Sequence, residues 1–477
     1  MKIAMFVEGC YPYVVGGVSS WVQMLLEACG EHDFLIHSLL PDREQSGQFK
    51  YKIPSNVLEI REAYLNDEDR IELFRKKTKM NRAEKECFRN LIFGKNIDWQ
   101  KIFMFFEKKD VSVNDILMGE DFFEIVQDLY IKKYPQCVFT DFLWSILSLY
   151  MPLFTILKVP VAEADCYHAI STGYAGILAC KGFYLYHKPV ILTEHGIYTR
   201  EREEEIIKVD WTQGIFKELW INYFYMLSSC IYDCASKVIS LFEASRKIQM
   251  ELGCGSEKTK VISNGVYVQE YAHMPGKDPD DTYINVGAIL RVVPIKDVKT
   301  MINAFALAQE RIANLKLYIM GPTDENPEYY EECLELMKSF GVKNIVFTGR
   351  INVKDYLGKM DMTILTSISE GQPLSILESM AASKPCIATD VGGCRELLYG
   401  GERDSLGKSG IIVPVMSVDK IANAIVELAT DEELRAEMGY TGRLRVKAFY
   451  QNEQVAKTYR ELYEECKSRR WEDVWQE

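Results

Sequence analysis

EGQPLSILE, the stretch from Glu370 to Glu378, decides the fold of the C-terminal half of this chain. It follows MDMTILTS (360–367), which predicts a buried strand, and its own second half is an apolar run typical of a helix. Glu370 then lies on a strand-to-helix loop, and Glu378 lies about one and a half turns into the helix. Helix N-termini attract anions, and carboxylates accept hydrogen bonds from hydroxyls. The pair therefore indicates a phosphorylated sugar or ribose ligand, unless Glu370 only caps the helix and Glu378 is solvated.

The composition is that of a folded protein with more than one domain. A chain of 477 residues is too long for one core, and about 150 residues per domain predicts two or three domains. The hydrophobic content of 48% and the charged content of 26% are ordinary for globular proteins. A net charge of −13 argues against nucleic acid as the main ligand, because no overall basic field is present.

The cysteines and the N-terminus favour a cytosolic protein. Thirteen cysteines are scattered without CxxC or finger-like spacing, which is typical of reduced thiols. The start from Met1 to Val7 is typical of a strand rather than of a signal peptide.

FLWSILSLYMPLFTILKVPV (142–161) is almost wholly apolar and about as long as a membrane span. It contains Pro152, Lys158 and Pro160, and no basic cluster follows it. We therefore expect a buried helix followed by a buried strand, with peripheral membrane contact left open.

The N-terminal part, up to about residue 275, begins as a strand-loop-helix unit. KIAMFVEG (2–9) predicts a strand and WVQMLLEAC (21–29) an amphipathic helix, and the loop between them contains Gly16 and Gly17, which let a ligand approach the backbone. Residues 62–135 predict a mostly helical insertion. Strands return at KPVILTEH (188–195) and KVISLF (237–242), with a long aromatic helix between them.

A short linker, AHMPGKDPDDT (272–282), precedes a second α/β pattern. Strands and helices alternate through residues 276–450 with short connections, which predicts a doubly wound parallel sheet. The last segment, 451–477, predicts a long amphipathic helix that packs back on the first domain. Two Rossmann-like α/β domains of this kind place a ligand cleft where the carboxyl ends of both sheets face each other.

Two cations lie beside the first strand of the C-terminal domain. Arg291 and Lys296 are five residues apart, on the loop and at the start of the next helix, where a diphosphate would be bound well. Solvated surface cations are the alternative.

Polar residues also end strands of the N-terminal domain. Glu194, His195 and Gly196 follow KPVIL, and His168 and Ser171 follow VPVAEADC, although a lone histidine is more often structural. ISNGV (262–266) ends another strand with an Asn-Gly turn near the hinge.

Taken in order, these motifs carry a resemblance. GGV, HG, NGV, R-x4-K and E-x7-E resemble the retaining nucleotide-sugar glycosyltransferases of family 4, which have the GT-B fold. CYPYVVGGVSSWV, STGYAG, LTEHGIYTRER, RVVPIKDVKT and GPTDENPEYY are similar to the PelF-like members of that family, cytosolic enzymes of Pel exopolysaccharide synthesis. The resemblance covers nearly the whole chain and is strongest from Gly287 to Pro414.

The resemblance implies a role for each matching residue. Arg291 and Lys296 would neutralise the donor diphosphate, and Glu370 would accept hydrogen bonds from the sugar hydroxyls. Glu378 would hold the ribose, while His195 would contact the sugar near the reacting carbon. The remaining implied donor-binding residues are Gly16 and Gly17 at the phosphate, Arg350 and Ile351 at the uracil, and Gly371, Gln372, Pro373 and Leu374 with their backbone at the sugar and phosphate. Gln372 stands where many relatives carry Phe, which leaves the donor sugar open.

The expected reaction is retaining transfer of a hexose or N-acetylhexosamine from a UDP-sugar to a growing polysaccharide, without metal or other cofactor. Asp67-Glu68-Asp69 and Asp278-Pro279-Asp280 have the letters of a metal motif, but the first falls in the helical insertion and the second in the linker. The resemblance also implies inner-membrane Pel synthase subunits as partners, and a cytoplasmic protein that is peripheral at the membrane. A non-catalytic UDP-sugar-binding subunit and a GT-B sugar phosphorylase are the alternatives.

Overall fold

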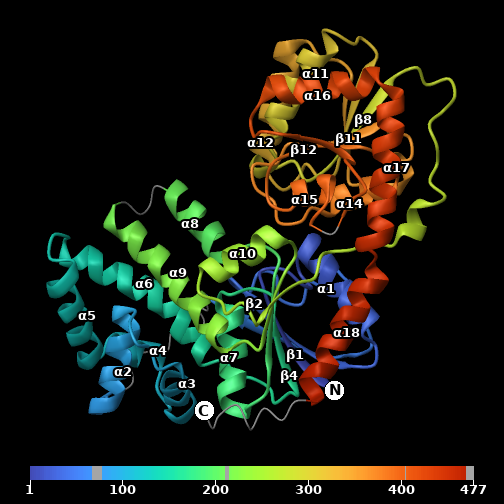
Figure 1. The fold of residues 1–477 in the computed structure, drawn as a ribbon. Helices are drawn as coiled ribbons and strands as arrows, with labels where there is room; N and C mark the ends of the chain where they lie inside the picture. The colour runs from blue at the N-terminus through green and yellow to red at the C-terminus, as the bar shows by residue number, and fades with distance from the viewer. Residues whose placement is uncertain (67–77, 210–213, 403, 469–477) are drawn as a thin grey trace. The chain divides into compact units, whose positions relative to one another are not determined.

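The computed structural model describes residues 1–66, 78–209, 214–402 and 404–468, which form two compact units (Figure 1). The first unit contains residues 1–240 and 246–260 together with the C-terminal segment from Tyr459. The second contains residues 241–245 and 261–458. The contacts thus divide the chain at residue 260, fifteen positions before the boundary expected near 275, and the linker 272–282 belongs wholly to the second unit.

The first unit is built on a seven-stranded sheet with the order β3-β2-β1-β4-β5-β6-β7. Its strands are β1 (Lys2–Glu8), β2 (Asp33–Leu40), β3 (Val57–Tyr64), β4 (Cys166–Ala169), β5 (Val190–Glu194), β6 (Lys237–Ser240) and β7 (Thr259–Val261). The helices in this part of the chain are α1 (Gly17–Ala28), α2 (Arg82–Phe93), α3 (Trp99–Lys108), α4 (Val113–Leu117), α5 (Glu120–Lys133), α6 (Phe139–Leu157), α7 (Tyr174–Tyr186), α8 (Tyr198–Lys208), α9 (Ile215–Cys234) and α10 (Glu243–Glu251).

The second unit has a six-stranded sheet with the order β10-β9-β8-β11-β12-β13, and its paired strands are parallel. The strands are β8 (Ile284–Ile289), β9 (Leu315–Met320), β10 (Ile345–Gly349), β11 (Met362–Leu365), β12 (Cys386–Thr389) and β13 (Gly410–Val413). The helices that follow β8 along the chain are α11 (Val298–Gln309), α12 (Pro327–Phe340), α13 (Lys354–Leu357), α14 (Leu374–Ala381), α15 (Cys394–Tyr399), α16 (Val418–Thr430), α17 (Glu432–Phe449) and α18 (Asn452–Ser468), and α18 belongs to the first unit from Tyr459 onward. Short 3-10 turns lie at Val268–Tyr271 and Pro294–Lys296.

Helices cover both faces of the second sheet. One apolar cluster joins α11, α12 and α16 to the strands, and another joins α14, α15 and α17 to the opposite face. A parallel sheet with helices on both faces buries both sides of its strands, and in β11 every residue from Met362 to Leu365 is buried. The doubly wound architecture predicted from the sequence is confirmed for both units.

The apolar stretch 142–161 agrees only in part with the predicted buried helix and buried strand. Its helix, α6, is long and apolar enough to cross a membrane by length and composition, but half of its most apolar window is buried within the protein. Phe142, Ile146 and Phe154 on the buried side join the main core of the unit. The expected strand directly after it is wrong. The chain runs irregularly through Pro160 and does not pair until β4 begins at Cys166, because Pro160 and the acidic residues near it do not suit a central strand.

The helical insertion begins later than the sequence predicted. Residues 62–64 belong to β3, and neither β2 nor β3 was foreseen. Helices α2 to α5 then form a layer that packs on α6 and α7 (Figure 1). Asn81 and Glu84 close a capping box at the start of α2, and Gly94, with φ of 65°, ends that helix in the left-handed conformation. Between β5 and β6 the chain forms two helices, α8 and α9, where one long aromatic helix was expected.

The C-terminal helix α18 packs on the first unit from Tyr459 onward. The hydroxyl of Tyr463 lies 2.8 Å from Nδ1 of His168, and the hydroxyl of Tyr459 lies 3.1 Å from Oγ1 of Thr193. The indole of Trp21 in α1 contacts the Tyr459 ring edge-on at a centroid distance of 5.3 Å. These contacts cover one face of the sheet, because adjacent residues of a strand alternate in direction: Tyr167 packs against α7 while His168 faces α18.

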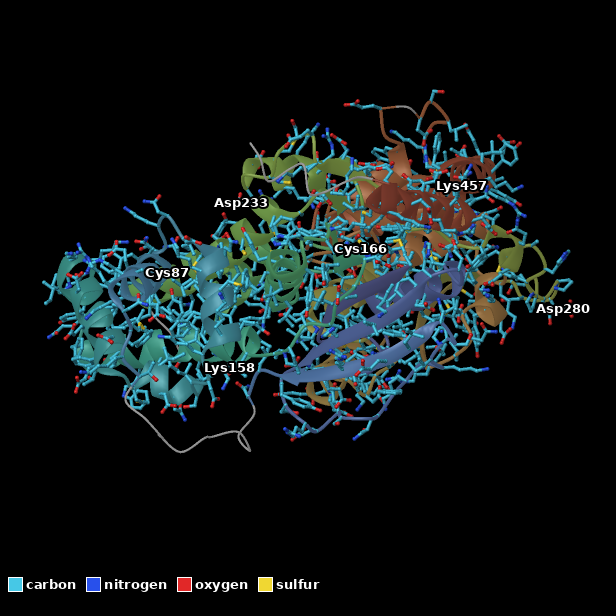
Figure 2. The ribbon with its side chains drawn as sticks, turned by 90° about the horizontal axis from the view of Figure 1, so that it is seen from below. Cys87, Lys158, Cys166, Asp233, Asp280 and Lys457 are labelled. Carbon is cyan, nitrogen blue, oxygen red and sulfur yellow. The ribbon has the colours of Figure 1, made fainter. Side chains whose placement is uncertain are left out.

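None of the cysteines in the described ranges forms a disulfide. Most are buried on helices and strands, as Cys87 on α2 and Cys166 on β4 illustrate (Figure 2). Burial raises the pKa of the Cys87 thiol to about 11 and that of Cys386 to about 12. Such thiols stay protonated and unreactive at neutral pH.

Arg445 of α17 is the largest fully buried polar side chain of the second unit. Its guanidinium bonds to the carboxylate of Asp404 and to the carbonyl of Leu398 at 2.8 Å and Oγ of Ser409 at 2.9 Å. The carbonyls of Leu397 and Gly407 also accept hydrogen bonds from it. Because the side chain is fully buried, these partners rather than water stabilise the ion.

We therefore expect Arg445→Met to destabilise the protein by about 3 kcal/mol or more, because it leaves the Asp404 carboxylate buried without its cation. Urea unfolding followed by circular dichroism measures this. The control Lys447→Met, at an exposed position on the same helix, should change the unfolding midpoint little, and equal midpoints for both variants would contradict the role of the pair.

Candidate functional site

The candidate site of the second unit lies where the strand order reverses. Strands β8 and β11 are neighbours in the sheet, with Met362 paired to Val286, although two strands separate them in the sequence. The connections that leave their carboxyl ends run to opposite faces, which opens a crevice there, the usual ligand position in open parallel sheets. Lys296 follows β8 and Glu370 follows β11.

Lys296 and Glu370 meet at this edge across 74 positions of sequence. Nζ of Lys296 lies 2.5 Å from Oε1 of Glu370, and Oγ of Ser367 donates to the same oxygen at 2.5 Å. Only 17% of the lysine side chain and 11% of the glutamate side chain is exposed. A mostly buried cation and a mostly buried carboxylate thus meet just before α14, whose first residue is Leu374.

Backbone contacts hold this pair in place. Oγ1 of Thr366 donates to the carbonyl of Lys296 at 3.0 Å, and the amide of Ile368 donates to the carbonyl of Ile295 at 2.9 Å. The loop after β12 supports it from the other side: a Cβ at Gly392, where φ is 51°, would lie 2.1 Å from the carbonyl oxygen of Glu370. Gly392 is therefore needed for the close approach of the two loops.

The two arginines predicted for the diphosphate and the base have carboxylate partners of their own. Arg291 bonds to Glu325 at 2.7 Å and Arg350 bonds to Asp324 at 3.2 Å. Both acids belong to the loop after β9, a loop that the sequence analysis used only for its resemblance. Since these pairs are exposed, each arginine exchanges partners at little cost.

Gln372 has a structural role. Its buried side-chain oxygen accepts a hydrogen bond from the amide of Asn264 at 2.6 Å, and its Nε2 donates to the carbonyl of Leu241 at 3.2 Å. The side chain thus ties the loop after β11 to two other segments of the same unit, and Asn264 of the ISNGV turn returns a bond to the Gln372 carbonyl at 3.2 Å.

Glu378 lies in the second turn of α14 and is partly exposed. The hydroxyl of Tyr271 hydrogen-bonds its carboxylate, and the protein packed around the carboxyl raises its pKa to about 7. Lys354 acts in the opposite direction, since its charge lowers the pKa of Glu378. Tyr271 was missed in the sequence because it lies in a 3-10 turn before the linker, where an aromatic residue gives no sign of a distant carboxylate.

The first unit has a polar cluster at its own point of strand reversal, between β1 and β4. Glu8 ends β1, and its carboxylate accepts hydrogen bonds from Ser171 Oγ at 3.3 Å, the Ala175 amide at 3.2 Å and Tyr198 at 3.4 Å. Burial raises the pKa of this carboxyl above its ordinary value. Ser171 was predicted from the sequence as a strand-end residue, but Glu8 was not. An acidic residue that ends an apolar strand just before Gly9 was the available signal.

His195 lies just after β5, as predicted. Its ring contacts Trp21 edge-on at 4.5 Å, and its Nε2 has no hydrogen-bond partner in the described part of the chain. Burial lowers the pKa of His195 to about 4, so the imidazole is neutral near pH 7. Gly16 and Gly17 lie at the entrance of α1, where the amide of Gly16 is 3.4 Å from the Tyr51 hydroxyl.

Two polar residues near His195 are structural. His168 lies inside β4, not on a loop after a strand as expected, and both ring nitrogens are hydrogen-bonded, to Tyr463 and to Thr193. Glu194 is buried and accepts bonds from Tyr232 at 2.7 Å and from Gln249 at 2.9 Å, and burial raises its pKa to about 7.

The two acidic motifs with the letters of a metal site were located in the structure. Within residues 1–66, 78–209, 214–402 and 404–468 no three His, Cys, Asp or Glu side chains are placed together to hold an ion. Asp278 and Asp280 are exposed in the linker, and Asp67-Glu68-Asp69 lies outside the described residues.

Comparison with known proteins agrees with the two-unit architecture. HepE from Anabaena, in a structure with UDP and glucose, matches with a TM-score of 0.60 at 15% identity, over 97% of this chain and 99% of that one. Sucrose-phosphate synthase from Thermosynechococcus elongatus matches with a TM-score of 0.61 at 16% identity, over 97% and 98%. The class is therefore an α/β protein with the GT-B fold of glycosyltransferases.

The chain belongs to the family described as "Domain of unknown function (DUF3492)", which matches residues 1–257. The family "Glycosyl transferases group 1" matches residues 281–431, where the Lys296 and Glu370 pair lies.

Among curated relatives, N-acetyl-alpha-D-glucosaminyl L-malate synthase of Bacillus anthracis is 30% identical over 35% of this chain and 42% of its own length. Putative glycosyltransferase EpsD of Bacillus subtilis (strain 168) is 30% identical over 40% of this chain and 48% of its own. The chain thus spans less than half the length of these two relatives.

Glu378 should make stability fall as pH rises. Its pKa is about 7 in the folded protein and 4.5 as the ordinary value, so between these pH values the folded state binds more protons than the unfolded state. Its contribution therefore favours folding at low pH and is lost as pH rises toward 7. We expect the melting temperature of Glu378→Gln, relative to that of the unmodified protein, to increase from pH 5 to pH 8.

Differential scanning fluorimetry in matched buffers measures this difference. Glu328→Gln, at an exposed carboxylate in the first turn of α12, is the control and should give a constant offset. A constant offset for Glu378→Gln as well would contradict the raised pKa.

Proposed function

We propose that this protein is a retaining glycosyltransferase that moves a hexose or N-acetylhexosamine from a UDP-sugar to a growing exopolysaccharide. The observation that carries the proposal is the Lys296 and Glu370 pair at the reversal point of the second sheet, in front of the N-terminus of α14. A cation, a helix N-terminus and a hydroxyl-binding carboxylate are what a sugar diphosphate needs at one place. The match of residues 281–431 to a glycosyltransferase family supports it.

The donor is assigned to residues around this pair. Lys296 bonds the diphosphate together with the free amides at the start of α14, and Arg291 leaves Glu325 to share that charge. Glu370, once Lys296 turns to phosphate, accepts hydrogen bonds from the sugar. Glu378 in its ionised form accepts hydrogen bonds from the ribose hydroxyls, and Arg350 with Ile351 borders the uracil. HepE, whose structure holds UDP, is similar in fold, which supports uridine as the base.

The family resemblance also assigns residues of the first unit. His195 is neutral, and its Nε2 has no hydrogen-bond partner among the described residues, so it suits a hydrogen bond to a sugar hydroxyl. Gly16 and Gly17 are assigned to the phosphate by the family resemblance.

The mechanism follows from the charges that develop. As the bond between the anomeric carbon and the phosphate oxygen breaks, the sugar becomes oxocarbenium-like and negative charge grows on UDP, where Lys296 and the helix N-terminus stabilise it. The acceptor hydroxyl attacks the same face of the sugar, its oxygen bonds to the anomeric carbon, and its proton passes to the leaving phosphate. The anomeric configuration is retained. No metal ion is required in this scheme, because protein cations carry the diphosphate charge.

The biological setting is proposed on the resemblance to PelF-like enzymes. The acceptor is then a Pel-like exopolysaccharide, the partners are inner-membrane synthase subunits, and the protein is cytoplasmic and peripheral at the membrane. The protonated thiols and the half-buried α6 fit this setting.

Lys296→Ala and Glu370→Ala should each lower sugar transfer by about a hundredfold or more, since each removes a group that binds developing charge or the sugar itself. Transfer is measured as UDP release from UDP-sugars with an exopolysaccharide acceptor. Circular dichroism should be unchanged in both variants.

The matched controls are Lys299→Ala, at a lysine of α11 that pairs with Glu332 at 2.6 Å, and Glu328→Ala. Both should retain near-normal transfer. UDP, but not GDP or ADP, should raise the melting temperature of the unmodified protein. Normal turnover in the Lys296 variant, or protection by GDP alone, would refute the site assignment.

The product should have the same anomeric configuration as the donor. Proton NMR of the first product formed from an α-linked UDP-sugar should show an α-anomeric signal, because front-face attack keeps the new bond on the side of the leaving group. A β-anomeric product would exclude the proposed mechanism while leaving transfer itself intact.

A further inference from the structure

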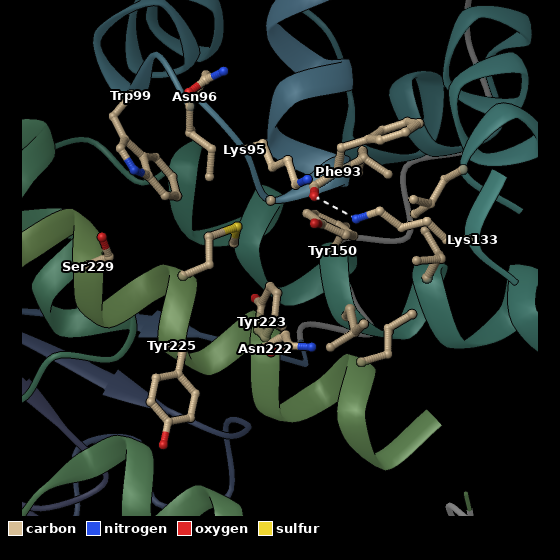
Figure 3. Close-up of a pocket in the computed structure, with 18 of the residues that line it drawn as sticks. Phe93, Lys95, Asn96, Trp99, Lys133, Tyr150, Asn222, Tyr223, Tyr225 and Ser229 are labelled. Atoms are coloured by element: carbon tan, nitrogen blue, oxygen red, sulfur yellow. Dashed lines mark hydrogen bonds between the residues drawn. The ribbon is translucent and has the colours of Figure 1, made fainter. Parts of the chain in front are cut away.

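A cavity of about 640 Å³ lies in the helical part of the first unit. It is lined by α2, α5, α6 and α9, by the turn after α2 and by Trp99 at the start of α3, and no strand-end loop of the candidate site contributes to it (Figure 3). Its volume lies within the range of about 300–1,000 Å³ that small-molecule sites have.

The floor of the cavity is aromatic and buried. Trp99, Tyr150 and Tyr223 line it, with 8%, 5% and 4% of their surfaces exposed. The two tyrosine rings meet edge-on at a centroid distance of 5.7 Å. Their hydroxyls are already bonded to the protein, Tyr150 to the carbonyl of Leu91 at 3.1 Å and Tyr223 to Tyr174 at 3.2 Å. The floor therefore offers ring surface rather than hydroxyl groups.

The rim is polar and exposed. Asn96 stands on the turn that follows α2, with φ of 51°, while Asn222 and Ser229 stand on α9. None of these three side chains makes a hydrogen bond within the described part of the chain. Lys133 donates to the carbonyl of Phe93 at 3.3 Å, drawn as a dashed line in Figure 3. Amide and hydroxyl groups with unused donors and acceptors thus surround the aromatic floor.

This combination identifies the ligand class. The C–H faces of a pyranose ring pack on aromatic rings, and its hydroxyls exchange hydrogen bonds with amides and hydroxyl groups. A simple anion is a poorer fit, because Asp233 lines the cavity together with Lys95 and Lys133. A lipid chain is a poorer fit as well, because burying it would desolvate the rim amides without giving them partners.

We propose that this cavity is a saccharide-binding site, which holds a stretch of the acceptor glycan apart from the place of transfer. The identification of this saccharide as the acceptor rests on the proposed function. The assignment of the ligand as a saccharide rests on the residues that line the cavity. A second binding site for the glycan raises the effective concentration of the acceptor and keeps the glycan bound between successive transfers.

The test uses the full chain with chito- and malto-oligosaccharides of three to six sugar units, by saturation-transfer NMR and calorimetry. At least one series should bind, and Asn96→Ala with Asn222→Ala should weaken its binding by about tenfold. Ser229→Trp, which adds a ring at an exposed rim position, should abolish binding. The matched control is Gln100→Ala with Gln127→Ala, which removes two exposed amides of α3 and α5 outside the cavity and should change nothing.

Three results would overturn the inference: no saccharide binds, the bound saccharide is insensitive to the rim variants, or oleate binds in a manner that Ser229→Trp blocks while no saccharide does. Protection by UDP, followed by thermal shift in the same variants, should be unchanged. If UDP fails to protect the unmodified protein while saccharide binding persists, the proposed transferase function fails and the cavity remains a saccharide site.

Discussion

The ion pair between Lys296 and Glu370 is the interaction on which the functional interpretation depends. Each residue alone would be an ordinary surface charge, but the parallel order of β8 and β11 brings the two loops to one edge of the sheet. In the protein without ligand the two charges neutralise each other, so neither is left half-buried and uncompensated. A bound sugar diphosphate would break the pair, because its phosphate would attract Lys296 and its sugar hydroxyls would donate hydrogen bonds to Glu370. The pair therefore stabilises the empty site and presents both binding groups.

The same architectural constraint acts in the first unit. The order of β1 and β4 brings Glu8 and Ser171 together at the equivalent edge, although 163 positions separate them. The buried Glu8 is held by hydroxyl and amide donors instead of a lysine. Burial raises the pKa of Glu8, and the positive charge of Arg202 lowers it by a smaller amount. The two units thus share a topology but differ in the electrostatics of the edge where their strand order reverses.

The helical layer of the first unit shows how a long apolar sequence is used in a protein core. α6 is apolar enough to resemble a membrane span, yet the side that holds Phe142, Ile146 and Phe154 packs into the common core. On the same helix, Tyr150 closes the floor of the cavity. One helix therefore supports the sheet, the insertion and a concave aromatic surface, and its composition follows from those three packing partners.

The sequence by itself determined the α/β class, the two doubly wound halves and the strand-end positions of Glu194, His195, Arg291 and Glu370. Those follow from local periodicity and from glycines that only particular turns accept, both of which are written in neighbouring residues. Tertiary structure alone decided the partners: Glu370 with Lys296, Arg291 with Glu325, Glu378 with Tyr271, and Gln372 with Asn264 rather than with a ligand. It also placed His168 inside a strand and shaped the aromatic cavity. Strand order and helix packing set those contacts across tens to hundreds of residues, and no local pattern encodes which distant side chain completes a hydrogen bond or an ion pair.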